Sequence, residues 1–209
     1  MHETRVTFLA AASEARAVLV LAEVEERWHE ESALAGMTIG ALAAHLTRAV
    51  GTVETYLRAH VHGGVEPMSA AAYVANLYSP DAGSELNMGI RERAAEAALQ
   101  GIRALIEAFD TSMSHLRHTL AAEPDDRVVE VRSRLVLPLD EYLLTRIVEL
   151  TLHTDDLCVS VGRQTPALSG MAQAIALLVD VAELRHGEVA VLRALARRER
   201  DEVGALRVL

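Results

Sequence analysis

Three side chains in this sequence are of the types that bind divalent metals, and their spacing allows them to share one ion. Glu149 and His153 are four residues apart, so on a helix they project from one face, about 6 Å apart along the axis. His45 lies in another segment with helical periodicity and could complete the set from a facing helix. A zinc ion with three protein ligands keeps a position free for water or substrate, which is typical of catalytic sites. The three residues therefore indicate a reactive metal centre.

The same residues also allow an interpretation without a metal. The Glu-x-x-x-His spacing recurs at Glu25 and His29, where charged neighbours explain it by solvation. Glu149 and His153 differ in having an apolar setting, and a carboxylate near a core is costly unless it is paired or bound to a metal. A polar contact of Glu149 with His153 or Arg146 at the rim of a helical bundle would also provide the carboxylate with a partner. The residues alone leave both interpretations open.

Two neighbouring residues could support such a centre. Arg146, one turn before Glu149, could orient that carboxylate, attract an anionic substrate or form a surface ion pair. Asp156, three residues after His153, could accept a hydrogen bond from the imidazole and fix its tautomer, as carboxylates behind metal ligands do. The alternative for Asp156 is a solvated charge.

The elements that must position these residues are helices, because apolar residues recur at helical spacing along most of the chain. A Thr38 hydroxyl can cap the second helix and Gly162 can end the fourth. We predict four long helices before Pro166, then a fifth helix and a charged helical segment from Glu188. The four long helices are predicted over residues 8–22, 39–57, 94–120 and 138–161.

The connections between these helices are less regular. Residues 60–87 form a long connection rich in Gly and Pro, with a short helix expected over 70–77; long connections of this kind are often functional. Residues 127–137 alternate in a way that permits a short strand or two. Since an isolated hairpin is marginally stable, we predict an ordered connector there.

The composition supports a helical protein that does not bind nucleic acid. The chain has 209 residues, of which 51% are hydrophobic and only 3% aromatic, which suits one domain or a domain with an extension. The net charge of −10 argues against binding to phosphate backbones. The basic residues Arg193, Arg197, Arg198 and Arg200 alternate with acidic ones and are predicted to form a solvated helix face.

Cysteine usage and hydropathy indicate the compartment. Cys158 is the only cysteine, so nothing suggests disulfide bonds or an oxidising environment. The N-terminus lacks the pattern of a secretory signal, and the longest apolar runs are far shorter than a bilayer span. We therefore expect a cytoplasmic protein without a membrane partner.

Two motifs resemble a known family. Residues 36–46 read Gly-Met-Thr-Ile-Gly-Ala-Leu-Ala-Ala-His-Leu, and residues 146–157 read Arg-Ile-Val-Glu-Leu-Thr-Leu-His-Thr-Asp-Asp-Leu. Together they resemble the mycothiol-dependent maleylpyruvate isomerase N-terminal domain family, part of the wider DinB-like group of metalloenzymes. The resemblance extends over roughly the first 160 residues. There are two departures: Met37 stands where the family commonly has Trp, and the stretch after Pro166 is shorter than the C-terminal domain that contributes to the isomerase's active site.

The resemblance implies a fold and a site. The fold is all-α, a DinB-like four-helix bundle with a long crossover connection over residues 1–165, followed by a short helical C-terminal extension over 166–209. The site is a divalent metal, usually zinc, held by His45, Glu149 and His153. Arg146 and Asp156 would then support these ligands.

The implied activity is that of a transferase or isomerase linked to a low-molecular-weight thiol of the mycothiol type. The cation would lower the pKa of the thiol, and the thiolate would attack a small electrophile. As an isomerase it would add to a double bond, allow rotation and leave; as a transferase it would stay attached. The alternatives are a metal-dependent hydrolase and a non-enzymatic small-ligand-binding or regulatory protein. The expected partners are a small substrate and a thiol, with a homodimer through the C-terminal tail.

Overall fold

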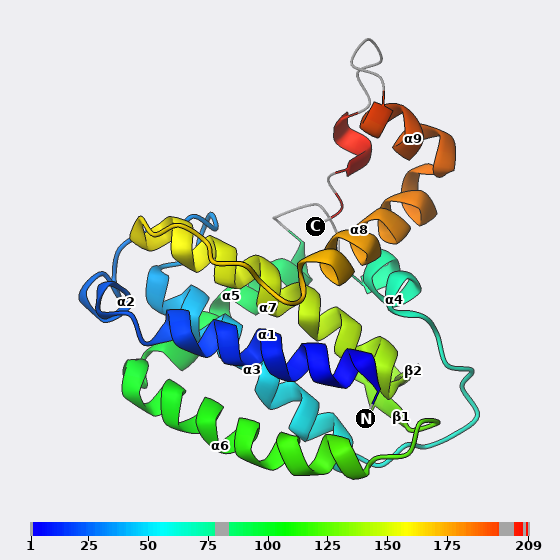
Figure 1. Cartoon of the computed structure of the whole chain (residues 1–209), viewed down its shortest axis with the longest axis horizontal. Coiled ribbons are helices and arrows are strands. Elements are labelled where there is room, and N and C mark those ends of the chain that lie inside the picture. Colours follow the sequence, from blue (N-terminus) through cyan, green and yellow to red (C-terminus); the bar gives the residue numbers. More distant parts are fainter. Residues whose placement is uncertain (1, 78–83, 197–202, 207, 209) are drawn as a thin grey trace.

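The computed structural model describes residues 2–77, 84–196, 203–206 and 208, and these are mostly helical (Figure 1). The structure also contains a two-stranded antiparallel sheet, formed by β1 (Val128–Val131) and β2 (Leu135–Pro138). There are two short 3₁₀ helices, η1 (Arg132–Arg134) and η2 (Val203–Leu206). The α-helices are α1 (Glu3–Leu19), α2 (Ala22–Glu26), α3 (Ile39–Arg58), α4 (Ala70–Leu77), α5 (Glu85–Ala98), α6 (Gly101–Ala122), α7 (Leu139–Val161), α8 (Met171–His186) and α9 (Glu188–Ala196). The predicted all-α fold class is confirmed.

Four long helices enclose the hydrophobic core. Helix α7 packs against α1 and α3, and α6 packs against the same two helices. Their inward faces carry fully buried side chains such as Phe8, Leu46, Leu116 and Leu143. Burial of each such side chain contributes about 1.5–3 kcal/mol. This core fixes α3 and α7, the two helices that carry the predicted metal ligands.

The ends of α3 and α7 follow from local chemistry. The Thr38 hydroxyl accepts a hydrogen bond from the Ala41 amide at 3.1 Å, which caps the first turn of α3. Gly162 ends α7 with a φ of 74°, a left-handed conformation that glycine adopts without steric cost. Both predicted boundaries are therefore confirmed.

A buried arginine ties three chain segments together. Arg5 on α1 is 1% exposed, and its guanidinium donates to both carboxylate oxygens of Asp140 at the start of α7. It also donates to the carbonyl oxygens of Leu120, Glu123 and Pro124 at the end of α6. All five of its N–H groups thus have acceptors, which makes the burial of this charge affordable.

Two predicted connections differ in the structure. The helix predicted over 94–120 is two helices, because the chain turns between Ala98 and Gly101, where Gly101 has a φ of 78°. The segment predicted as a connector, 127–137, contains a hairpin in which Val129 pairs with Leu137. Both side chains are fully buried against the core, and this packing supplies the stability that an isolated hairpin lacks.

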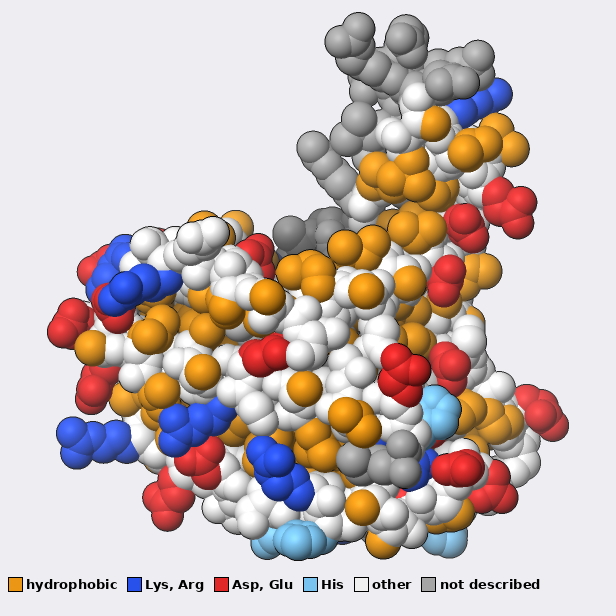
Figure 2. Space-filling model, in the orientation of Figure 1, with side chains coloured by type: hydrophobic (Ala, Val, Ile, Leu, Met, Phe, Trp, Pro, Cys, Tyr) orange, Lys and Arg blue, Asp and Glu red, His pale blue; other side chains and the backbone are white. Residues whose placement is uncertain are grey.

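The segment after Pro166 consists of α8 and α9. Helix α8 packs on α4 and α7, and α9 extends away from the four long helices (Figure 1). Apolar side chains cover part of the surface of this segment (Figure 2). Its exposed apolar residues include Leu184 on α8 and Leu192 and Leu195 on α9. The division of the chain at residue 166 and the homodimer stay predictions. The predicted helical segment from Glu188 is confirmed as far as Ala196, and the next six residues, 197–202, lie outside the described part.

The predicted short helix over 70–77 is confirmed as α4, while residues 78–83 of the same connection lie outside the described residues. Within the part of the chain that the structure describes, we find no helix of the length and apolar character that a bilayer span requires.

Candidate metal centre

The structure brings the three predicted ligands together between α3 and α7. His45 projects from the second turn of α3, and Glu149 and His153 lie one turn apart in the middle of α7. The Nε2 atom of His45 lies 3.3 Å from Oε2 of Glu149, and Nε2 of His153 lies 3.2 Å from the same oxygen. All three ligand atoms lie within 4.8 Å of one another. The two imidazole rings meet edge to face, with their centroids 4.7 Å apart.

These distances suit a tetrahedral metal site. With bonds of 2.0–2.1 Å, a tetrahedral zinc ion separates its ligand atoms by about 3.3 Å. Two of the three ligand pairs already have this separation. Two imidazoles and one carboxylate form a donor set that zinc uses in catalytic sites. The residues therefore fit a divalent cation, although metal binding itself stays a prediction.

Asp156 stands behind His153, as predicted for a residue that supports a metal ligand. Its Oδ2 atom lies 3.0 Å from Nδ1 of His153. When Nδ1 donates to this carboxylate, Nε2 keeps its lone pair free for a cation. The neighbouring Asp155 accepts instead from the Thr165 hydroxyl. The two adjacent carboxylates thus have different hydrogen-bond partners.

His45 has no comparable partner behind it. Its Nδ1 atom is buried and makes no hydrogen bond with any described residue. The orientation of this ring is therefore set by packing and by the contact with Glu149, and it is held less firmly than that of His153.

The protonation states of the cluster follow from burial and from the contacts. Burial alone would raise the pKa of Glu149, but hydrogen bonds from His153 and His45 and the charge of Arg146 together hold it well below its usual range. Burial lowers the pKa of His45. Burial opposes a charge on His153 too, but Asp156 and Glu149 outweigh it and raise the pKa of His153 to about 9. Without a metal, a proton on His153 therefore takes the place that a cation would occupy.

Arg146 lies against the centre and is not at the molecular surface. Its side chain is 10% exposed, and its Nη2 atom lies 3.8 Å from Oε1 of Glu149. Its guanidinium carbon lies 5.2 Å from the centroid of the Tyr142 ring, a distance that permits a cation–π contact. The Tyr142 hydroxyl in turn donates to the Thr52 hydroxyl at 3.0 Å. Arg146 and Glu149 thus lie close together and are both largely buried, and the role of Arg146 in orienting this carboxylate stays a prediction.

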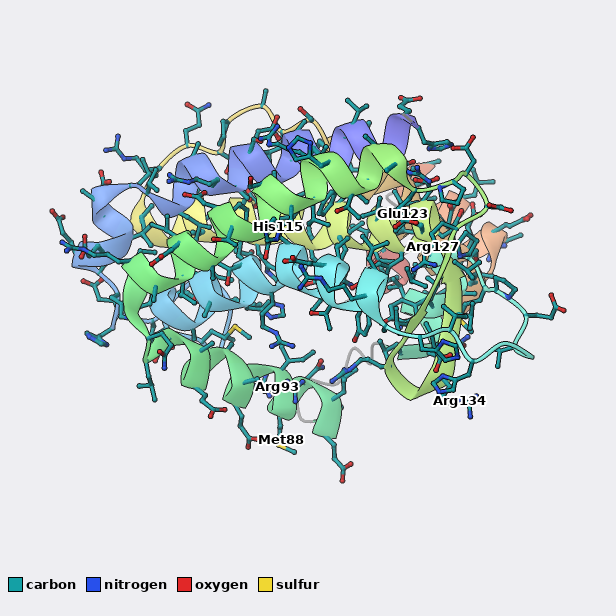
Figure 3. The ribbon with its side chains drawn as sticks, turned by 90° about the horizontal axis from the view of Figure 1, so that it is seen from below. Met88, Arg93, His115, Glu123, Arg127 and Arg134 are labelled. Carbon is teal, nitrogen blue, oxygen red and sulfur yellow. The ribbon has the colours of Figure 1, made fainter. Side chains whose placement is uncertain are left out.

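A pocket opens beside His45 and Glu149. Sequence reasoning missed several of its residues, which come from α3, α4, α5 and η1. Among them are Arg48, Tyr73, Arg93 and Arg132. Figure 3 shows Arg93 on α5, which packs against α3. Arg48 follows His45 by three residues, so helical spacing alone could have found it. The other three are brought to the pocket only by the tertiary fold.

Comparison with known proteins gives one match. The model of the family described as "Mycothiol maleylpyruvate isomerase N-terminal domain" matches residues 8–158, a range that includes all three candidate ligands. No curated protein and no solved structure matches the chain. The matched range ends just before the C-terminus of α7, so α8 and α9 lie outside it. Because the match spans most of the chain, the protein belongs to the mycothiol maleylpyruvate isomerase N-terminal domain family.

Proposed function

We propose that this protein is a metal-dependent transferase or isomerase that uses a low-molecular-weight thiol of the mycothiol type. The thiol attacks a small electrophile, and it either stays attached or leaves after the electrophile has isomerised. The observation that carries the proposal is the convergence of His45, Glu149 and His153 beside a pocket. Membership of the family supports the same class of chemistry.

In this proposal His45, Glu149 and His153 hold a divalent cation, and zinc suits the donor set best. Such a cation, when bound, supplies an open coordination position and lowers the pKa of a thiol placed there. Asp156 holds the tautomer of His153. Contacts with His153 and His45, together with the charge of Arg146, hold the pKa of Glu149 well below its usual range, so that the carboxylate is ionised and ready to bind a cation at neutral pH.

The pocket residues set the surroundings of the reaction. Tyr142 is almost fully buried, and burial raises its pKa to about 12. It therefore stays a neutral phenol, and its hydrogen bond to Thr52 fixes the ring as a wall of the pocket. Arg146 packs against this ring and adds positive charge beside the centre, where it can attract an anionic reactant.

Thiol consumption with and without metal tests the proposal. The full chain is supplied with mycothiol and a panel of small electrophiles, including activated alkenes and epoxides. We expect turnover that a chelator abolishes and zinc restores, and that Glu149→Gln lacks. Asp155→Asn, which changes a carboxylate of the same helix outside the centre, should keep it. Turnover that survives both metal removal and Glu149→Gln would refute metal dependence. Metal binding without thiol consumption by any electrophile would instead favour the small-ligand-binding alternative.

A further inference from the structure

We propose that helix α5 is a movable wall of the pocket beside the metal centre, and that it turns away from α3 to admit the reactants. The helix is held closed by one small group of apolar side chains and turns about Gly101. The proposal rests on the proposed function, because it concerns how a thiol and a small electrophile reach the centre.

The pocket is too small for both reactants in this structure. Its cavity volume is about 70 Å³, whereas sites for small molecules usually have about 300–1,000 Å³. The three candidate ligands are largely buried as well, with side-chain exposures of 15% for His45, 16% for Glu149 and 13% for His153. A thiol and an electrophile can therefore enter together only if one wall of the pocket moves.

Most walls of the pocket are anchored in the main core. Helices α3 and α7 each bury a long apolar face there. Helix α4 buries Ala70 and Tyr73 in the same core, and the Glu141 carboxylate on α7 accepts a hydrogen bond from the Ala70 amide at 2.6 Å. The hairpin that contains η1 is fixed by the buried side chains of Val129 and Leu137. These walls are costly to displace.

Helix α5 is anchored less firmly than the other walls. The structure describes all of its residues, and only Ala94 among them is buried. Ala94 and Ile90 pack with Met37 and Ala41 in a small cluster that is separate from the main core. We call these four residues the α5 cluster. Since segments with few buried apolar contacts open at the lowest cost, α5 is the wall that moves most readily.

The position of α5 shows what its movement would do. Figure 3 shows this helix at the edge of the molecule, with Arg93 on the side toward α3 and Met88 pointing away. Ile90 and Arg93 are the residues of α5 that line the pocket. When α5 turns away from α3, both side chains leave the pocket, which widens beside His45.

Gly101 provides the hinge for this movement. It joins α5 to α6 with a φ of 78°, and the described part of the chain places no atom within 4 Å of a Cβ built there. The backbone can therefore change its dihedral angles at this glycine without a clash, as hinges at the ends of elements do. Helix α6 stays in place beyond the hinge, because Phe109 and Leu116 hold it in the main core.

A cysteine probe in the pocket tests the inference. Ala49 lines the pocket from α3 and is 3% exposed, so Ala49→Cys places a thiol where a reagent arrives only when the pocket opens. The full chain carries this change together with Cys158→Ser, which removes the natural thiol, and is labelled with a maleimide dye in the presence of a chelator. We expect labelling about 10–1,000-fold slower than in Ser114→Cys, an exposed position on α6, because the open state is a minor one.

Two matched methionine variants assign the opening to α5. Met37→Ala removes packing from the α5 cluster, whereas Met113→Ala makes the same change in the main core, and both side chains belong to residues that are 5% exposed. Met37→Ala should speed labelling at position 49 by about tenfold or more, because it removes apolar contacts and leaves a cavity. Met113→Ala should change the rate by less than about twofold, since it weakens the core without releasing α5. Thermal unfolding checks that both variants are folded.

Hydrogen exchange of the unaltered chain gives a second measurement that needs no substitution. The amides of α5 should exchange at least about tenfold faster than those of α6, because α5 opens while the core stays folded.

Three results would overturn the inference. The first is that the probe at position 49 reacts as fast as the one at position 114, which would mean that the pocket is open without any movement. The second is that Met37→Ala does not speed labelling, or that Met113→Ala speeds it equally. The third is equal protection of the amides in α5 and α6. Because these measurements use neither metal nor turnover, their failure can be told apart from a failure of the proposed thiol chemistry.

Discussion

The contact between Asp156 and His153 predicts how tightly the centre should bind zinc. The two side chains meet at 3.0 Å, and the carboxylate holds the imidazole with Nε2 directed at Glu149. Asp156→Asn removes the charge and allows the ring to adopt either tautomer. Loss of such a contact behind a metal ligand typically lowers affinity by about 10–100-fold, which corresponds to about 1.4–2.8 kcal/mol.

The assay is competition for zinc between the protein and a chromophoric chelator at pH 7. The matched control is Asp155→Asn, which makes the same change of charge one residue away, where the carboxylate instead accepts from Thr165. We expect the Asp155 variant to bind zinc within about twofold of the wild type, since this half-buried carboxylate contacts Thr165 and none of the three candidate ligands. Equal affinities for the two variants, or no loss in Asp156→Asn, would refute the assignment of Asp156.

Three further predictions concern stability. Arg5→Met leaves the Asp140 charge without its partner and should lower the free energy of unfolding in urea by about 3–5 kcal/mol. Arg16→Met, a change on the same helix that breaks the more exposed pair with Asp110, should lower it by less than about 1 kcal/mol. Similar losses in the two variants would contradict the structure. In metal-free protein the raised pKa of His153 stabilises the fold below about pH 6.5. This contribution should be lost as the pH rises through about 9, so the melting temperature of the wild type should fall over this window more than that of His153→Gln, and parallel curves would count against the protonated state. Arg185 on α8 donates to two carbonyl oxygens of α4, at 3.3 and 3.1 Å, so Arg185→Met should speed amide exchange in α4 but not in α6, and unchanged exchange in α4 would show that these bonds contribute nothing.

The helices that carry the centre were predictable because their signals are local. Apolar residues at helical spacing, a Thr38 cap and a Gly162 terminus define α3 and α7 without reference to the rest of the fold. Glu149 and His153 are then placed on one face by the geometry of α7 alone. Joining His45 to them required the family resemblance, because periodicity does not say which helices face each other.

The features that the sequence did not predict depend on tertiary structure. The apolar spacing continues from Ala98 to Ile102 across the turn between α5 and α6, so only Gly101 marked the break. The hairpin is stable because Val129 and Leu137 are buried by the helices, which strand propensity cannot reveal.

The grouping of three arginines at the pocket beside the centre could not be predicted for a similar reason. Arg93 and Arg132 lie 45 and 84 residues from Arg48 along the chain. Sequence spacing carries no information about such contacts. Only the packing of α5 on α3, and the position of the hairpin beside α3, bring them to one pocket.

Elemental analysis of the purified full chain tests the central claim most directly. If His45, Glu149 and His153 form a metal site, protein dialysed against trace zinc should retain about one ion per chain. His45→Ala and Glu149→Ala should each retain almost none, while their circular dichroism shows an intact helical fold. Zinc content that is negligible in the wild type, or the same in the wild type and both variants, would contradict the account.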